Sequence, residues 1–251
     1  AVRAAANSRR TAMAGVDVTG TPARSPFGAR TRVRYRDRPM TRILLVRHGE
    51  STWNADGRWQ GQADPPLSDL GRSQAAEAAL RVGTVDALVT SDLQRAADTG
   101  VILARLLGAD HVATGWRLLV RYACAHPRLP RAALHARPPR LLADDPTGFE
   151  PGPDGGPRWP DGWESDDDLW DRLHIALTAL ARLVPDGDVL AVSHGGVVYA
   201  LERRLGALGR PRLSNLDGVH LEVTEDGDVT VGERISLVDP THTVPIESDR
   251  I

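Results

Sequence analysis

The amino-acid sequence predicts an α/β protein, a three-layer α/β/α sandwich with a mostly parallel central sheet. Three short apolar runs, at residues 42–47, 86–91 and 188–194, have the length and composition of buried strands. A segment with helical character follows each run, directly or after a loop, and strands that alternate with helices are typical of this fold class. Because ligands bind at the carboxyl ends of the strands in such sheets, we expect the functional site there.

The first half of the predicted domain contains two strands and two helices. The strand at 42–47 leads through a Gly-rich polar loop to Ser68, which is a suitable N-cap. The helix from Ser68 to about residue 81 has these apolar positions: Leu70, Ala75, Ala78, Ala79 and Val82. The strand at 86–91 leads to a helix from Asp92 to Leu107, which we expect to end at Gly108 because glycine commonly follows the last turn.

The middle of the chain has fewer local signals. Residues 117–163 are rich in Pro and Arg and show only a weak helical pattern near 130–142. Ser165 and the three aspartates after it predict a helix start, because serine caps backbone N–H groups and acids suit the positive end of the helix dipole. We expect this helix to reach about Val184.

The last part of the domain is predicted to contain the third strand, a helix and a hairpin. The strand at 188–194 is followed by helical sequence at 195–206. Residues 218–235 alternate around Asp226-Gly227, a pair that favours a tight turn, and therefore predict a β-hairpin.

The folded domain is expected to span residues 40–240, between two segments without periodicity. Residues 1–39 carry nine arginines against two acids, Asp17 and Asp37, and predict a disordered leader. The leader is either a targeting peptide or an upstream extension of the reading frame, since Met40 would be a natural start. Residues 241–251 are predicted to form a polar tail.

Composition narrows the classes of function. With 251 residues, of which 41% are hydrophobic and 25% charged, the chain can bury one substantial core. The formal charge of −2 provides no general attraction to nucleic acid or to an anionic membrane. The single cysteine, Cys124, excludes an intrachain disulfide, and no apolar run approaches the roughly 18 residues of a membrane span. We therefore expect a cytoplasmic protein without a nucleic-acid or membrane partner; its oligomeric state is not indicated.

Two histidines and two arginines stand at or near the predicted strand ends. Arg47 and His48 follow the first strand, Arg95 lies early in the helix after the second, and His194 ends the third. Arginines offer forked donors to phosphate oxygens, and helix starts at Asp92 and Gly195 would direct N–H groups to the same place. This pattern predicts a site for an anion.

His48 is a candidate nucleophile in this site. Neighbouring arginines disfavour a second positive charge, so its imidazole should stay neutral and keep the lone pair that attacks phosphorus. Phosphoryl transfer otherwise needs mainly positioning and neutralisation of charge, which Arg47, Arg95 and His194 can supply. We therefore expect neither a metal nor a cofactor.

Four ordered blocks, "RHGESTWN", "RWQGQADPPLSDLGRSQA", "SDLQRAADT" and "SHGG", resemble the histidine phosphatase superfamily in its phosphoglycerate-mutase-like branch. The resemblance implies a phosphoglycerate-mutase-like fold and a phosphohistidine intermediate on His48. It also implies a catalytic role for His194 and a phosphate site that comprises Arg47, Arg95, Asn54, Gln60, Gly61 and Gly195.

The implied function is hydrolysis of a small phosphorylated metabolite, a phosphate ester, without a metal. Two alternatives stay open, a phosphoglycerate mutase and a catalytically impaired protein that binds phosphorylated ligands. The second alternative arises because the family's usual acid is a glutamate after the third strand, whereas residues 111–143 contain six arginines and no Asp or Glu.

Three explanations are open for the missing glutamate. Glu150, Asp161 or Glu164 could replace it, the protein could be impaired, or residues 117–131 could reflect a misread frame. Glu164 and Ser165 resemble a Gly-Glu-Ser element that caps the following helix, so we expect a structural role for Glu164. The general acid therefore stays unassigned.

Overall fold

The structure is a computed structural model, which describes residues 39–58, 60, 63–109, 112–114 and 164–242. The predicted leader before residue 39, the weak helical pattern near 130–142 and the tail after residue 242 lie outside these ranges. Within them, every helix is too short or too polar to span a lipid bilayer.

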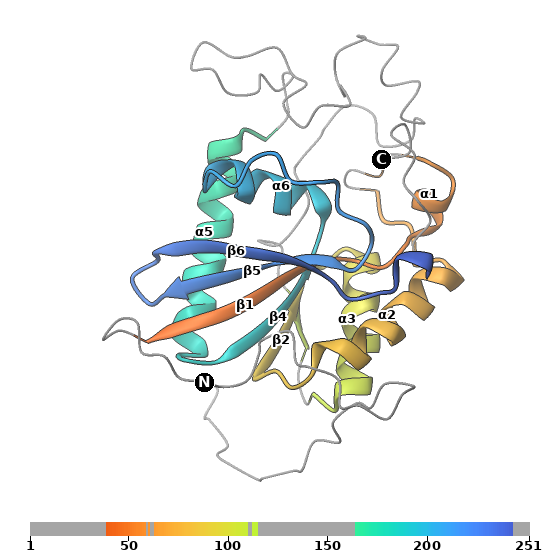
Figure 1. The fold of residues 1–251 in the computed structure, drawn as a ribbon, viewed down its shortest axis with the longest axis horizontal. Helices are drawn as coiled ribbons and strands as arrows, with labels where there is room; N and C mark the ends of the chain where they lie inside the picture. Colours follow the sequence, from red (N-terminus) through yellow and green to blue (C-terminus); the bar gives the residue numbers. More distant parts are fainter. Residues whose placement is uncertain (1–38, 59, 61–62, 110–111, 115–163, 243–251) are drawn as a thin grey trace.

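A single mixed sheet forms the centre of the described fold (Figure 1). Its strand order is β3-β2-β4-β1-β5-β6, in which the first four strands are parallel and the last two are antiparallel. The bounds are β1 Met40–Arg47, β2 Ala87–Thr90, β3 Val112–Thr114, β4 Asp188–Ser193, β5 Asp217–Thr224 and β6 Val229–Ser236. The predicted mostly parallel sheet and the hairpin are confirmed. The three-residue strand β3 was not predicted, because it is too short to produce a pattern.

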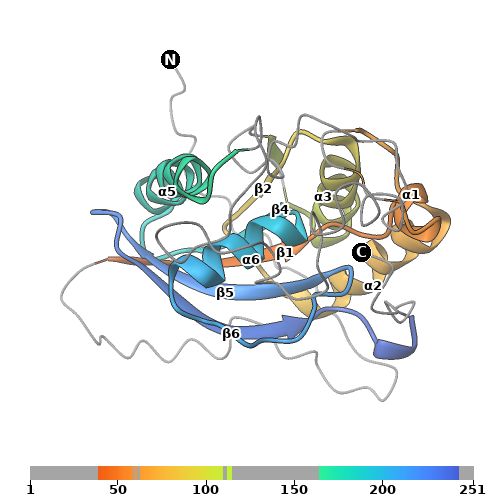
Figure 2. The ribbon, with the colours of Figure 1, turned by 90° about the horizontal axis from the view of Figure 1, so that it is seen from above.

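Helices cover both faces of this sheet, which confirms the three-layer sandwich (Figures 1 and 2). One face carries α2 and α3 and the other carries α5 and α6, with bounds α2 Asp69–Val82, α3 Gln94–Leu107, α5 Asp166–Leu183 and α6 Gly195–Arg204. Successive side chains of β1 point to opposite faces of the sheet, and helices cover each face, so the strand is buried on both sides. Ile43 and Leu45 pack with α5 and α6, whereas Leu44 and Val46 pack with α2 and α3.

Several predicted helix ends are confirmed by their capping geometry. Ser68 and Ser165 are N-caps whose side chains accept backbone N–H groups of the first turn. Gly108 follows α3 with a φ of 64°, in the left-handed region that favours glycine. Signals of this kind are readable from sequence because they depend only on neighbouring residues.

The predicted start of α3 at Asp92 is wrong, because the helix begins at Gln94 with Leu93 as an extended N-cap. The Asp64 carboxylate, 30 residues earlier, accepts the N–H of Gln94 at 2.6 Å. A cap from a distant loop leaves no signal in the local sequence. A short helix, α1 Thr52–Ala55, was also not predicted, although Ser51 caps it.

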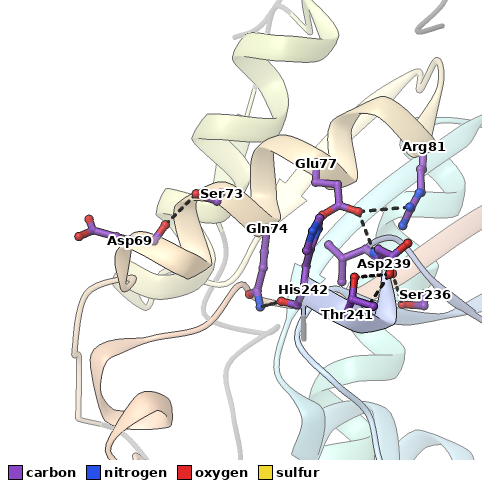
Figure 3. A network of polar contacts seen from close by, with 10 residues as sticks. Asp69, Ser73, Gln74, Glu77, Arg81, Ser236, Asp239, Thr241 and His242 are labelled. Atoms are coloured by element: carbon purple, nitrogen blue, oxygen red, sulfur yellow. Dashed lines mark hydrogen bonds and ion pairs between the residues drawn. The ribbon is translucent and has the colours of Figure 1, made fainter. Parts of the chain in front are cut away.

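The described chain continues past the predicted end of the domain at residue 240. Residues Pro240–His242 form a short 3-10 helix, and its last two residues belong to the predicted tail. His242 Nδ1 lies 2.7 Å from Glu77 Oε2, and Gln74 donates to the His242 carbonyl at 3.2 Å (Figure 3). His242, in the predicted tail, therefore contacts α2.

Candidate active site

The register of the sheet brings three strand ends together. Strand β1 pairs with β4 so that Arg47 lies opposite Ser193, and the N–H of His48 donates to the Ser193 carbonyl at 3.0 Å. On the other side of β4, the N–H of Ser91 donates to the Val192 carbonyl at 2.9 Å. The residues that follow β1, β2 and β4 therefore lie side by side at one edge of the sheet.

Four predicted site residues meet there and are almost completely buried. The exposed fractions are 5% for Arg47, 3% for His48, 1% for Arg95 and 2% for His194. The rings of His48 and His194 have centroids 5.2 Å apart and an interplanar angle of 64°. The predicted convergence of these residues is thus present in the structure.

Hydrogen bonds define which nitrogen of His48 carries the proton. Nδ1 lies 2.7 Å from the Gly49 carbonyl oxygen, which can only accept, so Nδ1 is the protonated nitrogen. Nε2 then keeps its lone pair and accepts a hydrogen bond of 3.2 Å from Arg95 Nε. The unprotonated nitrogen therefore faces a buried guanidinium.

The surroundings of both histidines favour the neutral form. Burial lowers the pKa of His48 well below its usual value, and the positive charges of Arg95 and Arg47 lower it further. Burial likewise lowers the pKa of His194 well below its usual value, and Arg95 is the strongest electrostatic contributor, with Arg172 on α5 among the weaker ones. Neither imidazole therefore carries a charge at neutral pH.

Two nitrogens of the Arg95 guanidinium donate hydrogen bonds that hold the side chain in place. Its Nη1 donates to the Ala63 carbonyl at 2.8 Å, in addition to the bond from Nε to His48. Burial lowers its pKa to about 10, an effect that Asp64 opposes, so the guanidinium stays charged at neutral pH. Thr99 Oγ1 links the Arg95 carbonyl, at 2.7 Å, to the N–H of Gly49, at 3.1 Å.

Arg47 is oriented by a loop between α6 and β5. Its Nη1 donates to the Leu213 carbonyl at 2.7 Å, and the N–H of Leu213 donates to the Tyr199 hydroxyl at 2.7 Å. Burial lowers the pKa of Arg47, whereas Tyr199, Asp217 and Glu50 raise it. Tyr199 and Leu213 were missed by the sequence analysis, because neither residue type indicates a contact with a distant arginine.

The same loop also holds the backbone at Arg47 and His48. Asn215 Nδ2 donates to the His48 carbonyl at 2.9 Å, and the N–H of Leu216 donates to the Arg47 carbonyl at 3.1 Å. Leu216 has a φ of 60°, which is uncommon for a residue with a branched side chain. We name residues 213–216 the clamp loop, because they contact both the side chain of Arg47 and the backbone on each side of His48.

His194 and Gly195 lie at the N-terminus of α6. His194 is the N-cap, but its side chain makes no capping hydrogen bond; its Nε2 lies 2.9 Å from Ser91 Oγ instead. A Cβ on Gly195 would lie 3.5 Å from Arg47 Cδ, which places the helix start directly beside this arginine. The positive end of α6 therefore points to the four buried residues.

Asn54 and Gln60 belong to local structure around Ser51. Asn54 and Ser51 form a capping box on α1, with distances of 3.1 and 3.2 Å, and the Ser51 hydroxyl donates to Gln60 Oε1 at 2.8 Å. Gly61 lies outside the described residues. A contribution of these three residues to phosphate binding stays a prediction.

Of the three acidic residues that could replace the missing glutamate, the structure describes one. Glu164 forms a bidentate pair with Arg172, at 2.5 and 2.9 Å, and both side chains are at most 10% exposed. This pairing agrees with the structural role that we expect for Glu164. Glu150 and Asp161 lie outside the described residues. In the described part of the chain, no group of three or more His, Cys, Asp or Glu could hold a metal ion.

Comparisons with known proteins find one matching family model and several similar proteins. The family model of the histidine phosphatase superfamily (branch 1) matches residues 43–231. The metal-independent phosphoserine phosphatase of Arabidopsis thaliana is 34% identical over 191 residues, which cover 72% of this chain and 77% of that protein. A protein of Cronobacter sakazakii named probable phosphoglycerate mutase is 36% identical over 166 residues, with coverages of 62% and 70%.

A solved structure extends the likeness to three dimensions. The mycobacterial glucosyl-3-phosphoglycerate phosphatase complexed with VO3 is 30% identical and superposes with a TM-score of 0.64. The match covers 76% of this chain and 96% of that chain.

Proposed function

Because the chain belongs to the histidine phosphatase superfamily, we propose that it is a metal-independent phosphomonoester hydrolase that forms a phosphohistidine on His48. One observation carries this proposal. The His48 imidazole is buried, donates Nδ1–H to the Gly49 carbonyl, and presents an unprotonated Nε2 to the Arg95 guanidinium. A lone pair beside a fixed cation suits attack on an anionic phosphoryl group.

The reaction would proceed in two displacements at phosphorus. In the first, the Nε2 lone pair of His48 forms a bond to phosphorus while the bond from phosphorus to the ester oxygen breaks. In the second, a water oxygen attacks phosphorus, the P–N bond breaks, and His48 regains its lone pair as inorganic phosphate forms. Arg47 and Arg95 would neutralise the phosphoryl oxygens in both steps, because hydrogen bonds to the Leu213 and Ala63 carbonyls already hold their guanidiniums in the site.

The departing ester oxygen needs a proton if it leaves as an alkoxide. Glu164 is poorly suited to supply it, since both of its carboxylate oxygens accept from Arg172. The general acid is therefore unassigned. Without one, only a leaving group that is stable as an anion can depart readily.

The proposed substrate is a small phosphorylated metabolite. Two matched relatives are named for such compounds, phosphoserine and glucosyl-3-phosphoglycerate. The cytoplasmic location expected from the sequence stays a prediction.

A second candidate is phosphoglycerate mutase activity, which the probable phosphoglycerate mutase of Cronobacter sakazakii supports. It would use the same phosphohistidine and differ only in the acceptor, a substrate hydroxyl in place of water. A third candidate, an impaired protein that binds phosphorylated ligands, follows from the absence of Asp and Glu between residues 111 and 143.

Rapid mixing with a radiolabelled phosphate ester tests all three candidates. A hydrolase should become labelled at His48 and release phosphate to water, a mutase should return the label to a second substrate, and an impaired protein should release none. His48→Ala should abolish acid-labile, base-stable labelling and turnover together. His194→Ala should slow turnover, and His242→Ala, outside the site, should change neither. Labelling of His48→Ala at Cys124 or at a serine would disprove the phosphohistidine.

A further inference from the structure

The two ring nitrogens of His194 have different surroundings. Nε2 lies 2.9 Å from the hydroxyl oxygen of Ser91, a residue that follows β2 and is 0% exposed. Nδ1 is buried and has no hydrogen-bond partner among the described residues. Because His194 makes no side-chain cap on α6, the start of that helix does not use Nδ1 either. A buried polar atom without a partner is uncommon, so Nδ1 is the nitrogen of His194 that is available to a bound ligand.

The Ser91 hydroxyl can donate to His194. Its oxygen accepts the N–H of Leu93 at 3.3 Å, which occupies part of its acceptor capacity and leaves its proton free to rotate toward Nε2. With Nε2 as the acceptor, the single proton of a neutral imidazole must lie on Nδ1. In the opposite arrangement, Ser91 Oγ would accept both the N–H of Leu93 and the Nε2–H of His194, and its own proton would have no acceptor among the described residues.

We infer that Ser91 is a positioning residue that selects the Nδ1–H tautomer of His194, and that this N–H donates to a phosphoryl oxygen. The second half of the inference rests on the proposed function. The tautomer itself does not, because it is a property of the free protein.

The inference gives the two buried histidines complementary roles. His48 uses its Nδ1–H internally, on the Gly49 carbonyl, and presents a lone pair from Nε2. His194 uses its Nε2 lone pair internally, on Ser91, and presents an N–H from Nδ1. One ring would therefore attack phosphorus while the other stabilises the charge on its oxygens without carrying a charge itself.

Nuclear magnetic resonance of the full chain with isotope-labelled histidine tests the tautomer directly. Long-range proton–nitrogen correlations distinguish Nδ1–H from Nε2–H in a neutral ring, and His194→Ala assigns the signals. We expect the Nδ1–H pattern for His194 in the wild-type protein without ligand. An Nε2–H pattern, or a charged ring at neutral pH, would overturn the inference without any variant of Ser91.

Two substitutions at Ser91 test whether its hydroxyl selects the Nδ1–H tautomer of His194. In Ser91→Ala, the Nε2–H tautomer should become populated and the Kd for inorganic phosphate should rise about tenfold, the cost of one hydrogen bond to a charged group. Ser91→Thr keeps the hydroxyl and should restore both properties. Ser73→Ala, which removes a hydroxyl bonded to the Asp69 carbonyl on the exposed side of α2, should change neither (Figure 3).

The outcomes separate this inference from the proposed function. An unchanged tautomer and unchanged phosphate affinity in a folded Ser91→Ala protein would show that Ser91 does not select the tautomer. If Ser91 selects the tautomer and phosphate affinity but no label appears on His48, the inference stands and the phosphohistidine is wrong.

Discussion

Arg95 Nε donates to His48 Nε2 across 3.2 Å, although the two residues are 47 positions apart. The bond joins a guanidinium on α3 to the unprotonated nitrogen of a histidine that follows β1. In the proposed reaction, the Arg95 guanidinium of the free protein therefore lies in the direction from which the phosphoryl group would approach His48 Nε2. A bound phosphoryl oxygen can replace Nε2 as its acceptor while Nη1 stays on the Ala63 carbonyl.

The two hydrogen bonds of the Arg95 guanidinium, to His48 and to the Ala63 carbonyl, predict that Arg95→Lys is not a conservative change. A lysine ammonium is a point charge and cannot maintain two separately directed bonds in the same geometry. We expect the rate of His48 labelling to fall roughly 10²-fold or more, as when one preorganised donor is removed from an active site. Arg105→Lys, at an exposed position of the same helix, is the control. Near-normal labelling of Arg95→Lys would assign Arg95 a structural role only.

Acid should destabilise the protein through its two buried histidines. Their pKa values lie well below 6.5 in the folded state but near 6.5 in the unfolded state, so between these values only the unfolded state binds the protons. The free energy of unfolding should therefore fall as the pH decreases below 6.5, by up to about 1.4 kcal/mol per pH unit for each histidine.

Urea denaturation over this pH range measures the effect. A double variant with His48→Gln and His194→Gln should show a flatter dependence than the wild type. A slope that the double variant does not reduce would show that other groups cause the acid sensitivity.

His242 should show the opposite shift. Its hydrogen bond to Glu77 raises its pKa above 6.5, so its contribution to stability is present below 6.5 and lost as the pH rises through the raised value (Figure 3). A titration followed by nuclear magnetic resonance should therefore give a midpoint above 6.5 for His242. Glu77→Gln should return that midpoint toward 6.5, while a midpoint that does not move would exclude this pair as the cause.

The absence of the usual acid predicts selectivity for the leaving group. A phenolate leaves readily as an anion, whereas an alkoxide needs a proton, so p-nitrophenyl phosphate should be hydrolysed measurably and sugar phosphates and phosphoglycerate much more slowly. Relative to a similar protein with the usual glutamate, we expect a loss of roughly 10²-fold or more in kcat on the alkyl esters. Similar rates on both classes, with chemistry rate-limiting, would show that another carboxylate serves as the acid.

Substitution of Glu150, Asp161 and Glu164 one at a time would then identify that carboxylate. The true acid is the one whose loss slows the alkyl ester selectively. For Glu164→Gln we expect no selective effect, but a loss of stability of roughly 3 kcal/mol, because Arg172 would lose its buried partner.

The clamp loop predicts an effect of Tyr199→Phe on phosphate binding. The change removes only the hydroxyl that accepts the N–H of Leu213, and should release the carbonyl that orients Arg47. We expect a loss of stability of about 1 kcal/mol and a several-fold rise in the Kd for inorganic phosphate. The control is Thr178→Val, which removes a buried hydroxyl without a hydrogen-bond partner among the described residues. A change in stability with unaltered phosphate affinity would limit Tyr199 to a structural role.

Local sequence patterns were sufficient to predict much of the fold of this protein. The caps at Ser68 and Ser165 and the stop at Gly108 depend on residues within one turn, so they could be predicted from their neighbours. The meeting of Arg47, His48, Arg95 and His194 could also be predicted, because parallel strands place their carboxyl ends at one edge of the sheet.

Local patterns therefore predicted the layers, most of the elements and the four residues at the centre of the candidate site. The contacts that orient these residues depend on the tertiary fold: Asp64 on the start of α3, the clamp loop on Arg47, and Ser91 on His194. These contacts join residues between 30 and 166 positions apart. Their geometry depends on strand register and on the path of loops across the sheet, and a hydrogen bond over such a separation leaves no periodicity or local pattern in the chain.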